Sequence, residues 1–173
     1  EVVDDEGQDV TATGGTGELL YRSPQLCTGY WDNPEATAEA FAGGWFHSGD
    51  LVRIDEQGYI YVVDRVKDVI NTGGVLVASR EVEDALYTHP AVAEVAVIGV
   101  PHEKWIEAIS AVVVTREPVT EDDLLTHARD QLASFKLPKS VHFVDELPKN
   151  PSGKLLKREL RERFGGTGSA VGR

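Results

Sequence analysis

The sequence of 173 residues lacks methionine altogether and contains no long apolar run. A helix needs about 18 or more consecutive apolar residues to cross a membrane, so no transmembrane segment is expected. The acidic residues 1–6 do not fit the basic start of a secretory signal peptide. Because no initiator methionine is present, we expect the sequence to be the C-terminal portion of a longer protein.

Cysteine is nearly absent as well, since Cys27 is the only one. A single cysteine excludes an intrachain disulfide and fits a reducing compartment, which favours a cytoplasmic location. No histidine lies near Cys27 in the sequence, and its surroundings are typical of a turn. We therefore interpret Cys27 as a structural residue rather than a nucleophile.

Positive charge is scarce, with 17 basic against 29 acidic residues and a net charge of −12. Residues 1–66 account for most of this negative charge, with 3 basic and 13 acidic side chains. Because phosphate binding needs a basic surface, no nucleic-acid partner is expected. Residues 149–163 go against the trend, with 6 basic and 2 acidic side chains. This local excess can attract a small polyanion, although we expect all of these charges except that of Lys154 to be simply solvated.

A central stretch, residues 58–74, has a pattern that changes along its length. Residues 59–64 have the two-residue period and the aromatic and β-branched content of a strand. Positions 64–68 contain four charged residues, beginning with Asp64, and because an unpaired buried charge is costly, the strand should reach the surface there. A short apolar run then ends at Gly73-Gly74, where glycine allows a positive φ or the close approach of a ligand. The pattern fits either a junction between two domains or a charged β-hairpin within one domain.

The residues before this stretch alternate short β-like runs with turns. Glu18–Tyr21 is a predicted strand, and a further strand begins at Trp45 and continues to Ile54. Between them, Pro34 suits the first position of a short helix predicted over residues 35–41. This part of the chain is therefore predicted to be rich in β-structure.

The residues after the central stretch predict a mixture of helices and strands, and hence an α+β fold. Ser79 is expected to cap a helix that ends near Tyr87, and Thr120 is expected to cap one that ends near Phe135. Pro101 is expected to end the first strand of this part. The predicted strands are 91–100, 108–115 and 141–144, the predicted last helix is 154–163, and the glycine-rich tail 165–173 is expected to be disordered.

Three motifs occur in a fixed order: Gly44-Trp45-Phe46-His47-Ser48-Gly49-Asp50, the central stretch, and Leu147-Pro148-Lys149-Asn150-Pro151-Ser152-Gly153-Lys154. In this order they resemble the ribose-binding motif, the hinge segment and the catalytic-lysine motif of the adenylate-forming enzymes. That superfamily includes acyl-CoA synthetases, luciferases and peptide-synthetase adenylation domains. A weaker match is Gly17-Glu18-Leu19 followed by Thr28-Gly29-Tyr30-Trp31, so the resemblance covers about residues 17–160.

The resemblance also implies a division of the chain into three parts. Residues 1–66 would be the β-rich end of the large N-terminal domain of the family. Residues 67–164 would be its small C-terminal α+β domain, followed by the tail 165–173 that the glycine-rich composition predicts to be disordered. Lys67 falls on the hinge position of the family, where the backbone absorbs the change in φ and ψ as one domain swings.

Lys154 follows Gly153 in a tight loop that can push one long side chain outward. An ammonium group in such a loop can stabilise charge that develops on a phosphate under attack. The stretch is not a Walker motif, because the upstream glycine is missing and Leu155 stands where a Ser or Thr would hold magnesium. A loop lysine is by itself usually a solvated surface residue. The resemblance implies that Lys154 is instead the catalytic lysine of adenylation and a ligand of ATP and AMP.

Asp50 and Arg65 are the other two residues that the resemblance assigns to the nucleotide. A carboxylate can accept hydrogen bonds from both hydroxyls of a ribose, although Asp50 alone also fits a turn or cap position. The resemblance implies that Asp50 binds the ribose and that Arg65 contacts the ribose or a phosphate. For Arg65, the alternative is a local ion pair with Asp64 or Asp68.

Gly73 and Gly74, by resemblance, line the passage through which the thiol of CoA reaches the acyl-adenylate. A turn that needs a positive φ is an alternative that is compatible with this role. Trp105 could stack on the adenine of CoA, although we expect a packed loop tryptophan.

The sequence departs from the family pattern close to these glycines. Val75 and Leu76 stand where many members carry polar residues, and Ile106 stands where a glycine often precedes Glu107. This departure puts in doubt a polar contact to substrate from position 76. It does not affect Lys154.

The resemblance implies an ATP-dependent acyl-CoA synthetase that acts on a carboxylic acid, most like the fatty-acid or medium-chain acyl-CoA ligases. ATP with Mg²⁺ and CoA would be its co-substrates, with Mg²⁺ held mainly by parts of the protein upstream of this sequence and no metal ligand expected among these residues. The acyl pocket would also lie upstream, so the chain alone is expected to be inactive. Two alternatives remain: an adenylating enzyme that passes the acyl group to a carrier protein, and a non-catalytic ligand-binding module.

Overall fold

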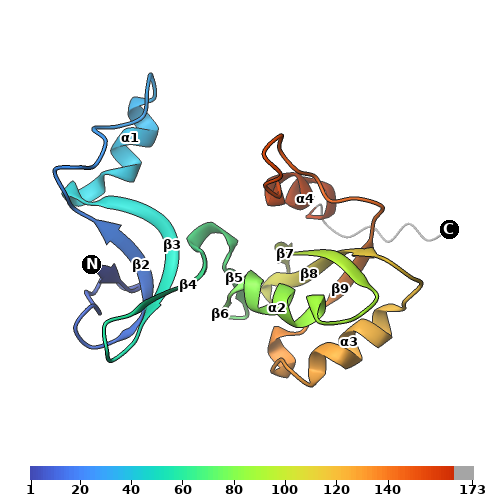
Figure 1. Cartoon of the computed structure of the whole chain (residues 1–173). Helices are drawn as coiled ribbons and strands as arrows, with labels where there is room; N and C mark the ends of the chain where they lie inside the picture. Colours follow the sequence, from blue (N-terminus) through green and yellow to red (C-terminus); the bar gives the residue numbers. More distant parts are fainter. Residues whose placement is uncertain (166–173) are drawn as a thin grey trace. The chain divides into compact units, whose positions relative to one another are not determined.

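The computed structural model describes residues 1–165. These residues belong to two compact units, the first running from Glu1 to Lys67 and the second starting at Asp68 (Figure 1). The division falls one residue after the predicted boundary between residues 66 and 67. The predicted disordered tail, residues 165–173, lies outside the described residues from residue 166 on.

The first unit is built on a four-stranded antiparallel sheet in the order β1–β2–β3–β4. The strands are β1 (Val2–Val3), β2 (Gly15–Tyr21), β3 (Phe46–Ile54) and β4 (Ile60–Arg65). A small apolar core is formed by Val2, Leu19 and Val52. The prediction that this part is rich in β-structure is confirmed. The expectation that all the charges near the end of β4 reach the surface is wrong, because Asp64 is buried and accepts the backbone N–H of Arg65 at 2.8 Å.

A short helix, α1 (Pro34–Ala40), lies between β2 and β3 in the chain. The side chain of Asn33 caps it by accepting the backbone N–H of Ala36 at 3.0 Å, and Pro34 occupies the first turn. None of the helix residues is buried, so local capping rather than core packing defines this helix.

The pairing of β2 with β3 contains an irregularity that shapes the site described below. Glu18 pairs with Leu51 and Leu20 pairs with His47, so a single residue of β2 lies opposite residues 48–50 of β3. Gly49 has a φ of 69°, which a residue with a side chain adopts only with strain. The extra residues bend β3 just before Asp50.

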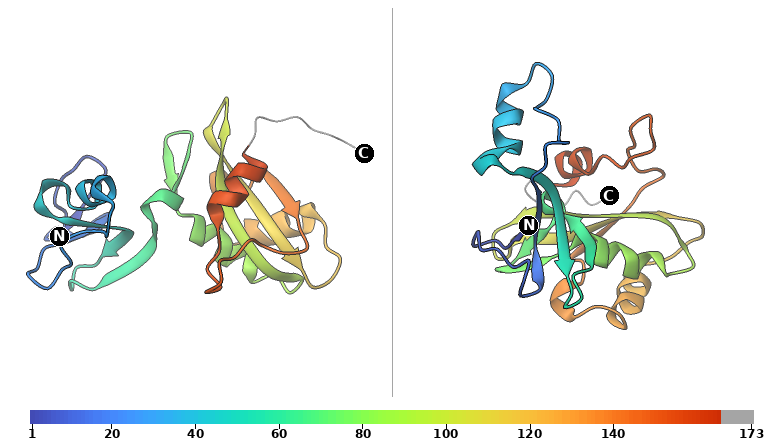
Figure 2. Two further views of the ribbon diagram at one scale, coloured as in Figure 1. Left: turned by 90° about the horizontal axis from the view of Figure 1, so that it is seen from above. Right: turned by 60° about the vertical axis from the view of Figure 1, so that its left-hand side comes forward.

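The second unit contains a five-stranded sheet in which β9 lies parallel to β8 and all other pairs are antiparallel. Its strands are β5 (Ile70–Thr72), β6 (Val75–Val77), β7 (Val92–His102), β8 (Ile106–Thr115) and β9 (Ser140–Phe143). Strands β7 and β8 form a long hairpin (Figure 2). The helices are α2 (Ser79–Tyr87), α3 (Glu121–Arg129) and α4 (Lys157–Phe164), which confirms the predicted α+β fold.

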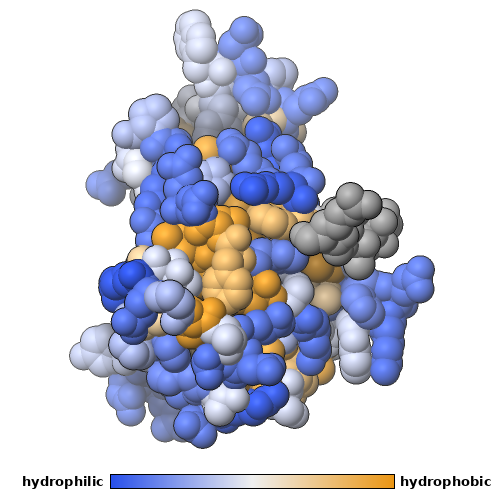
Figure 3. Space-filling view, turned by 90° about the vertical axis from the view of Figure 1, so that its right-hand side faces the viewer, coloured by the Kyte–Doolittle hydropathy of each residue, from blue (hydrophilic) through white to orange (hydrophobic). Residues whose placement is uncertain are grey.

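The two faces of this sheet carry separate apolar cores. Helices α2 and α3 cover one face, where Leu86 and Leu124 pack against strand residues such as Ile109 (Figure 1). Helix α4 covers part of the other face, where Leu160 packs against Ile98. Some apolar surface remains open, as Figure 3 shows for one side of the molecule. The exposed large apolar side chains of this unit are Val75, Leu76, Tyr87, Ile106, Phe135 and Phe143.

Three predicted element boundaries in this unit are wrong. Pro101 does not end β7, which continues to His102, because β7 lies at the edge of the sheet where proline is tolerated. Helix α3 ends at Arg129, well before residue 135, and the last helix begins at Lys157 rather than at residue 154. The strand β6 is not predicted from the sequence at all.

Ser79 is also not the helix cap that the sequence predicts. Ala78 precedes the first turn of α2, and Ser79 is its first helical residue. The side chain of Ser79 is fully buried, and its hydroxyl accepts a hydrogen bond from the ammonium of Lys157 in α4 at 2.7 Å. A contact with a residue so far along the chain replaces the local capping bond.

Candidate functional site

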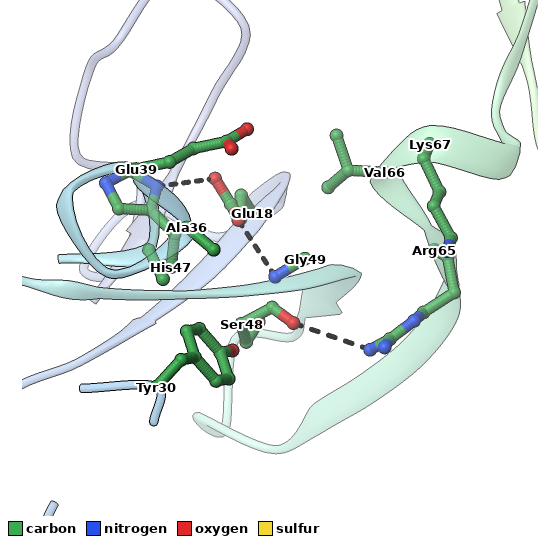
Figure 4. A pocket seen from close by; sticks show the side chains of 11 residues that line it. Glu18, Tyr30, Ala36, Glu39, His47, Ser48, Gly49, Arg65, Val66 and Lys67 are labelled. Carbon is green, nitrogen blue, oxygen red and sulfur yellow. Dashed lines mark hydrogen bonds and ion pairs between the residues drawn. The ribbon is translucent and has the colours of Figure 1, made fainter. Parts of the chain in front are cut away.

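The first unit contains a hollow of about 570 Å³ (Figure 4). Its walls come from β2, from the bent part of β3, from α1 with the loop before it, and from the end of β4 with the following turn. The lining residues are Glu18, Tyr30, Ala36, Glu39, Ala40, His47, Ser48, Gly49, Arg65, Val66 and Lys67. Three of the four stretches matched by family resemblance therefore contribute to one hollow.

Glu18 ties β2 to the bend of β3. One carboxylate oxygen accepts the backbone N–H of Gly49 at 2.9 Å, and the other lies 2.9 Å from Nδ1 of His47 (Figure 4). The Glu18 and His47 side chains are half-buried, with 25% and 35% of their surfaces exposed. The N–H of Gly49 would otherwise lack a partner in the irregular pairing, so Glu18 stabilises the bend that precedes Asp50.

Asp50 and Arg65 lie opposite each other on β3 and β4. Their side chains form an ion pair between Oδ1 of Asp50 and Nη1 of Arg65. The same guanidinium nitrogen lies 3.4 Å from the carbonyl oxygen of Ser48 (Figure 4). The backbone N–H of Asp50 donates to the Ser48 hydroxyl at 3.0 Å. Both side chains are partly exposed. Arg65 lines the hollow, whereas Asp50 is not among the lining residues, although the preceding Gly49 is.

Lys67 lies in a short 3₁₀ helix, Val66–Asp68, that follows β4. Its side chain lines the hollow, and it is the last residue of the first unit. Asp68, the next residue, opens the second unit, where its carboxylate accepts a hydrogen bond from Nη2 of Arg161 at 2.7 Å. The predicted hinge position therefore coincides with the change from one unit to the next.

Lys154 stands on a tight loop in the second unit, which we call the lysine loop (residues 149–155). The side-chain oxygen of Asn150 accepts three hydrogen bonds: from the backbone of Ser152 at 3.1 Å, from its hydroxyl at 2.8 Å, and from the backbone of Lys154 at 2.8 Å. Gly153 has a φ of 82°, and Lys149 pairs with Leu155 across the base of the loop.

The side chain of Lys154 is exposed, and its ammonium has no hydrogen-bonding or ion-pairing partner among residues 1–165. The base of the lysine loop is fixed to the sheet by a contact of 2.6 Å between Nζ of Lys149 and Oε2 of Glu94. Within residues 1–165, the lysine loop thus carries a positive charge that has no acidic partner. This arrangement suits a cation that acts on a bound anion.

Gly73 and Gly74 are the two turn residues of the β5–β6 hairpin, with φ values of 66° and 87°. The N–H of Gly73 donates to the carbonyl of Trp105 at 2.6 Å, and a Cβ at position 73 would meet the Trp105 ring at 3.3 Å. The turn interpretation therefore holds for both glycines. Trp105 packs beside this turn, with the ammonium groups of Lys104 and Lys139 at 4.6 and 5.8 Å from its ring centroid.

Ile106 stands where many members of the family have glycine, and its φ is 67°. A β-branched residue is rarely found in this left-handed region, because its side chain crowds the backbone. Val75, Leu76 and Ile106 are 46%, 53% and 60% exposed. The three departures from the family pattern thus lie at the surface of the second unit.

The second unit thus has an α+β fold with an exposed lysine on a tight loop. Residues 81–154 match the family model of the AMP-binding enzyme C-terminal domain. This part of the chain is therefore an AMP-binding enzyme C-terminal domain.

Similar proteins include several acid-activating ligases. A feruloyl-CoA synthase of Amycolatopsis is 49% identical over 154 residues, covering 88% of this chain and 31% of the relative. A long-chain-fatty-acid–CoA ligase of Escherichia coli O157:H7 is 46% identical, covering 96% and 30%. A fatty acid–[acyl-carrier-protein] ligase, ScoC of Streptomyces coeruleorubidus, is 44% identical, covering 96% and 32%.

Among solved structures, ATP-bound MatB from Rhodopseudomonas palustris is 40% identical and superposes with a TM-score of 0.85. The superposition covers 95% of this chain and 33% of MatB. The chain thus spans about a third of the length of the relatives it matches.

The structure groups the predicted residues into two sets. Asp50, Arg65 and Lys67 lie at or beside the hollow of the first unit, whereas Lys154 and the Gly73-Gly74 turn belong to the second unit. Within residues 1–165, no three His, Cys, Asp or Glu side chains are grouped so that they could hold a metal ion. The helices of this part are too short or too polar to span a bilayer.

Sequence reasoning missed the role of Glu18, although Glu18 belongs to the weakest of the matched motifs. Its contact with Gly49 joins residues 31 positions apart, and no local pattern indicates such a contact. It also missed Lys157 and Arg161, whose charges were expected to be only solvated. That expectation is wrong, because both side chains form short ion pairs in the second unit.

Proposed function

We propose that the whole protein is an ATP-dependent acyl-CoA synthetase and that this chain supplies its movable small domain together with the adjoining part of its large domain. The observation that carries the proposal is the lysine loop, which holds an exposed Lys154 whose ammonium has no partner in the described part of the chain, within an AMP-binding enzyme C-terminal domain. The substrates would be a carboxylic acid, ATP and CoA.

In the first half-reaction, a carboxylate oxygen of the acid attacks the α-phosphorus of ATP. A new oxygen–phosphorus bond forms, the bond to the β-phosphate oxygen breaks, and pyrophosphate leaves with the electron pair. Lys154 stabilises the negative charge that builds up on the α-phosphate oxygens. Because this interaction strengthens as the charge develops, it lowers the barrier rather than simply tightening ATP binding.

Asp50 and Arg65 hold the nucleotide at the hollow of the first unit. The Asp50 carboxylate accepts hydrogen bonds from the ribose hydroxyls, and Arg65 orients that carboxylate through their ion pair and donates toward the ribose or a phosphate. Glu18 supports them indirectly, since it fixes the bend of β3 that leads into Asp50.

In the second half-reaction, the sulfur of CoA attacks the carbonyl carbon of the acyl-adenylate. The thioester bond forms, AMP leaves as the phosphate anion, and the thiol proton passes to solvent. We propose that the backbone at Lys67 turns between the two half-reactions, which its place at the end of the first unit supports. The side-chain-free turn at Gly73-Gly74 would then leave room for the thiol to approach.

Mg²⁺ would accompany ATP and neutralise part of its phosphate charge. The residues described in this chain offer no set of metal ligands, so we assign the ion to other parts of the protein. Cys27 is exposed and free, which agrees with the proposal that the protein works in the reducing cytoplasm.

A second candidate function is transfer of the acyl group to a carrier protein instead of CoA. The similarity to ScoC, a fatty acid–[acyl-carrier-protein] ligase, favours it. Both functions share the first half-reaction and therefore the roles of Lys154 and Asp50.

The full-length protein tests these proposals. ATP–pyrophosphate exchange should depend on a carboxylic acid, and a panel of octanoate, palmitate and ferulate would identify the acid class. Acyl-CoA formation with free CoA, compared with acylation of a phosphopantetheinylated carrier protein, separates the two acceptors. Absence of acid-dependent exchange with every acid would overturn adenylation itself. The 173-residue chain alone should release no pyrophosphate above background.

A further inference from the structure

Helix α4 follows the lysine loop and has two faces with different surroundings. Lys157 and Arg161 are four residues apart and share one face, which turns toward the rest of the second unit. Their side chains are only 14% and 30% exposed. On the outer face, Arg158 and Glu162 are 86% and 68% exposed and pair with each other at 3.5 Å. Lys157 and Arg161 therefore form contacts within the second unit, whereas Arg158 lies on the solvent-exposed face of the same helix.

Lys157 joins α4 to two other elements. Its ammonium donates to the buried hydroxyl of Ser79 at 2.7 Å and lies 2.7 Å from Oε1 of Glu83, both on α2. The same Glu83 oxygen accepts the backbone N–H of Val97 in β7 at 2.8 Å. Lys157 is only three residues beyond Lys154, so this junction fixes the end of the lysine loop.

Arg161 joins the same helix to the start of the second unit. Its Nη2 donates to Oδ1 of Asp68 at 2.7 Å, and the Asp68 side chain is only 13% exposed. Asp68 directly follows Lys67, at which we propose that the backbone turns. Helix α4 is therefore attached at one end to the lysine loop and along its length to the residue next to that turn.

We propose that Lys157 and Arg161 are positioning residues that make the lysine loop move with the backbone beyond Lys67 as one rigid body. This inference rests on the proposed adenylation function. If α4 were loosely attached, a turn at Lys67 would set the direction of the second unit but would leave the position of the Lys154 ammonium undefined. A misplacement of about 1 Å in a catalytic group can lower a rate by about 100-fold.

The test compares four variants of the full-length enzyme: Lys154→Ala, Lys157→Ala, Arg161→Ala and, as the matched control, Arg158→Ala. Adenylation is followed by pyrophosphate release at varied ATP, and thioester formation is followed separately from supplied acyl-adenylate and CoA. Lys157→Ala and Arg161→Ala should lower kcat of adenylation by about 10- to 100-fold with little change in KM for ATP. Arg158→Ala should behave as the wild type.

Two further measurements separate positioning from a general loss of structure. Lys157→Arg restores a cation beside Ser79 and Glu83, so it should recover most of the adenylation rate. Thermal unfolding identifies any variant that does not fold. In that case Asp68→Asn, which keeps the shape of the side chain but removes its charge, replaces Arg161→Ala and should show the same selective loss of adenylation.

The two proposals fail in different ways. Wild-type adenylation by the folded Lys157 and Arg161 variants, alongside a crippled Lys154→Ala, would overturn the positioning role and leave the proposed function intact. An equal loss in both half-reactions would also overturn it, because a loose lysine loop should affect only the step that uses Lys154. Full adenylation by Lys154→Ala would overturn the role of Lys154, whereas absence of acid-dependent adenylation by the wild type would overturn the proposed function itself.

Discussion

The two units hold their proposed functional side chains in opposite ways. In the first, Asp50 and Arg65 face each other across paired strands, and their charges are mutually satisfied. In the second, Lys154 stands on a turn, and its ammonium has no partner within the described residues. Residues that bind a nucleotide throughout the reaction gain from being fixed in a sheet. A cation that acts on transient charge gains from having no competing neighbour.

Removing Lys154 tests whether the unpaired cation of the second unit acts on transient charge, and it should have the largest effect on the adenylation rate. Lys154→Ala should lower kcat of adenylation by roughly 10²–10³-fold, because one preorganised charge stabiliser is lost. The KM for ATP should change little, since the interaction forms mainly in the transition state. Supplied acyl-adenylate should still react with CoA. A variant that adenylates normally, or that loses both half-reactions alike, would contradict this role.

Restricting the backbone at Lys67 tests whether the two half-reactions need different backbone conformations at this residue. Proline holds φ near −65° and removes a backbone N–H, so Lys67→Pro should exclude one of two backbone conformations. One half-reaction should slow by at least about tenfold while the other is spared, as expected when a hinge is blocked. Separate assays of acyl-adenylate and thioester formation measure this. Equal losses would mark Lys67 as an ordinary loop position.

The contrast between local and distant contacts also explains what the sequence predicts well. The turn at Gly153 and the exposure of Lys154 follow from neighbouring residues, because Asn150 supplies the hydrogen bonds of the lysine loop. The eight-residue motif therefore contains the side-chain hydrogen bonds that shape the turn around Lys154. The short helix α1 is predicted within one residue for the same reason, since Asn33 and Pro34 define its start.

Residues whose role depends on distant partners are the ones that sequence reasoning misjudges. Serine is a common helix-cap residue, but the hydroxyl of Ser79 accepts a hydrogen bond from Lys157, 78 positions away. Glu18 reaches Gly49 across the sheet. In both cases the partner becomes visible only once strands and helices are packed, and no period or propensity records it.

Weakening the ion pair of the first unit tests whether Asp50 and Arg65 bind the nucleotide throughout the reaction. Asp50→Asn keeps the shape of the side chain but removes the charge that attracts Arg65 and the ribose hydroxyls. Charge-assisted hydrogen bonds contribute about 1.5–3 kcal/mol, so KM for ATP should rise by about 10- to 100-fold, with a smaller loss of kcat. Asp5→Asn, in an exposed turn of the same unit, is the control. A loss confined to kcat would contradict a ribose-binding role.

Glu18→Ala measures how much the contacts of Glu18 with Gly49 and His47 contribute to stability and to ATP binding. It leaves the N–H of Gly49 and the ring of His47 without their acceptor, which should cost about 1 kcal/mol of stability in the half-buried setting. KM for ATP should rise by only a few-fold, because Asp50 remains. Chemical unfolding and ATP titration measure the two effects. Glu56→Ala, in the exposed β3–β4 turn, should change neither.

The smallest expected effect concerns Ile106, the first residue of β8, which has an unfavourable backbone conformation for its residue type. Its φ of 67° should cost about 1–2 kcal/mol for a residue with a side chain. Ile106→Gly removes that cost, but glycine adds about 0.5–1 kcal/mol of chain entropy to the unfolded state. The Ile106 side chain is 60% exposed, so little apolar burial is lost.

Ile106→Gly should therefore raise the free energy of unfolding by about 0.5–1 kcal/mol, the difference between these two terms. Ile106→Ala is the matched control, because it removes the same branched side chain but keeps a Cβ in the left-handed region. Urea unfolding followed by Trp105 fluorescence reports on the second unit, provided that Trp31 and Trp45 are replaced by phenylalanine in every variant. If glycine and alanine destabilise the unit equally, the side chain of Ile106 contributes packing that outweighs the strain. ATP binding at the first unit should be the same in all three proteins, because none of these changes touches the Asp50–Arg65 pair.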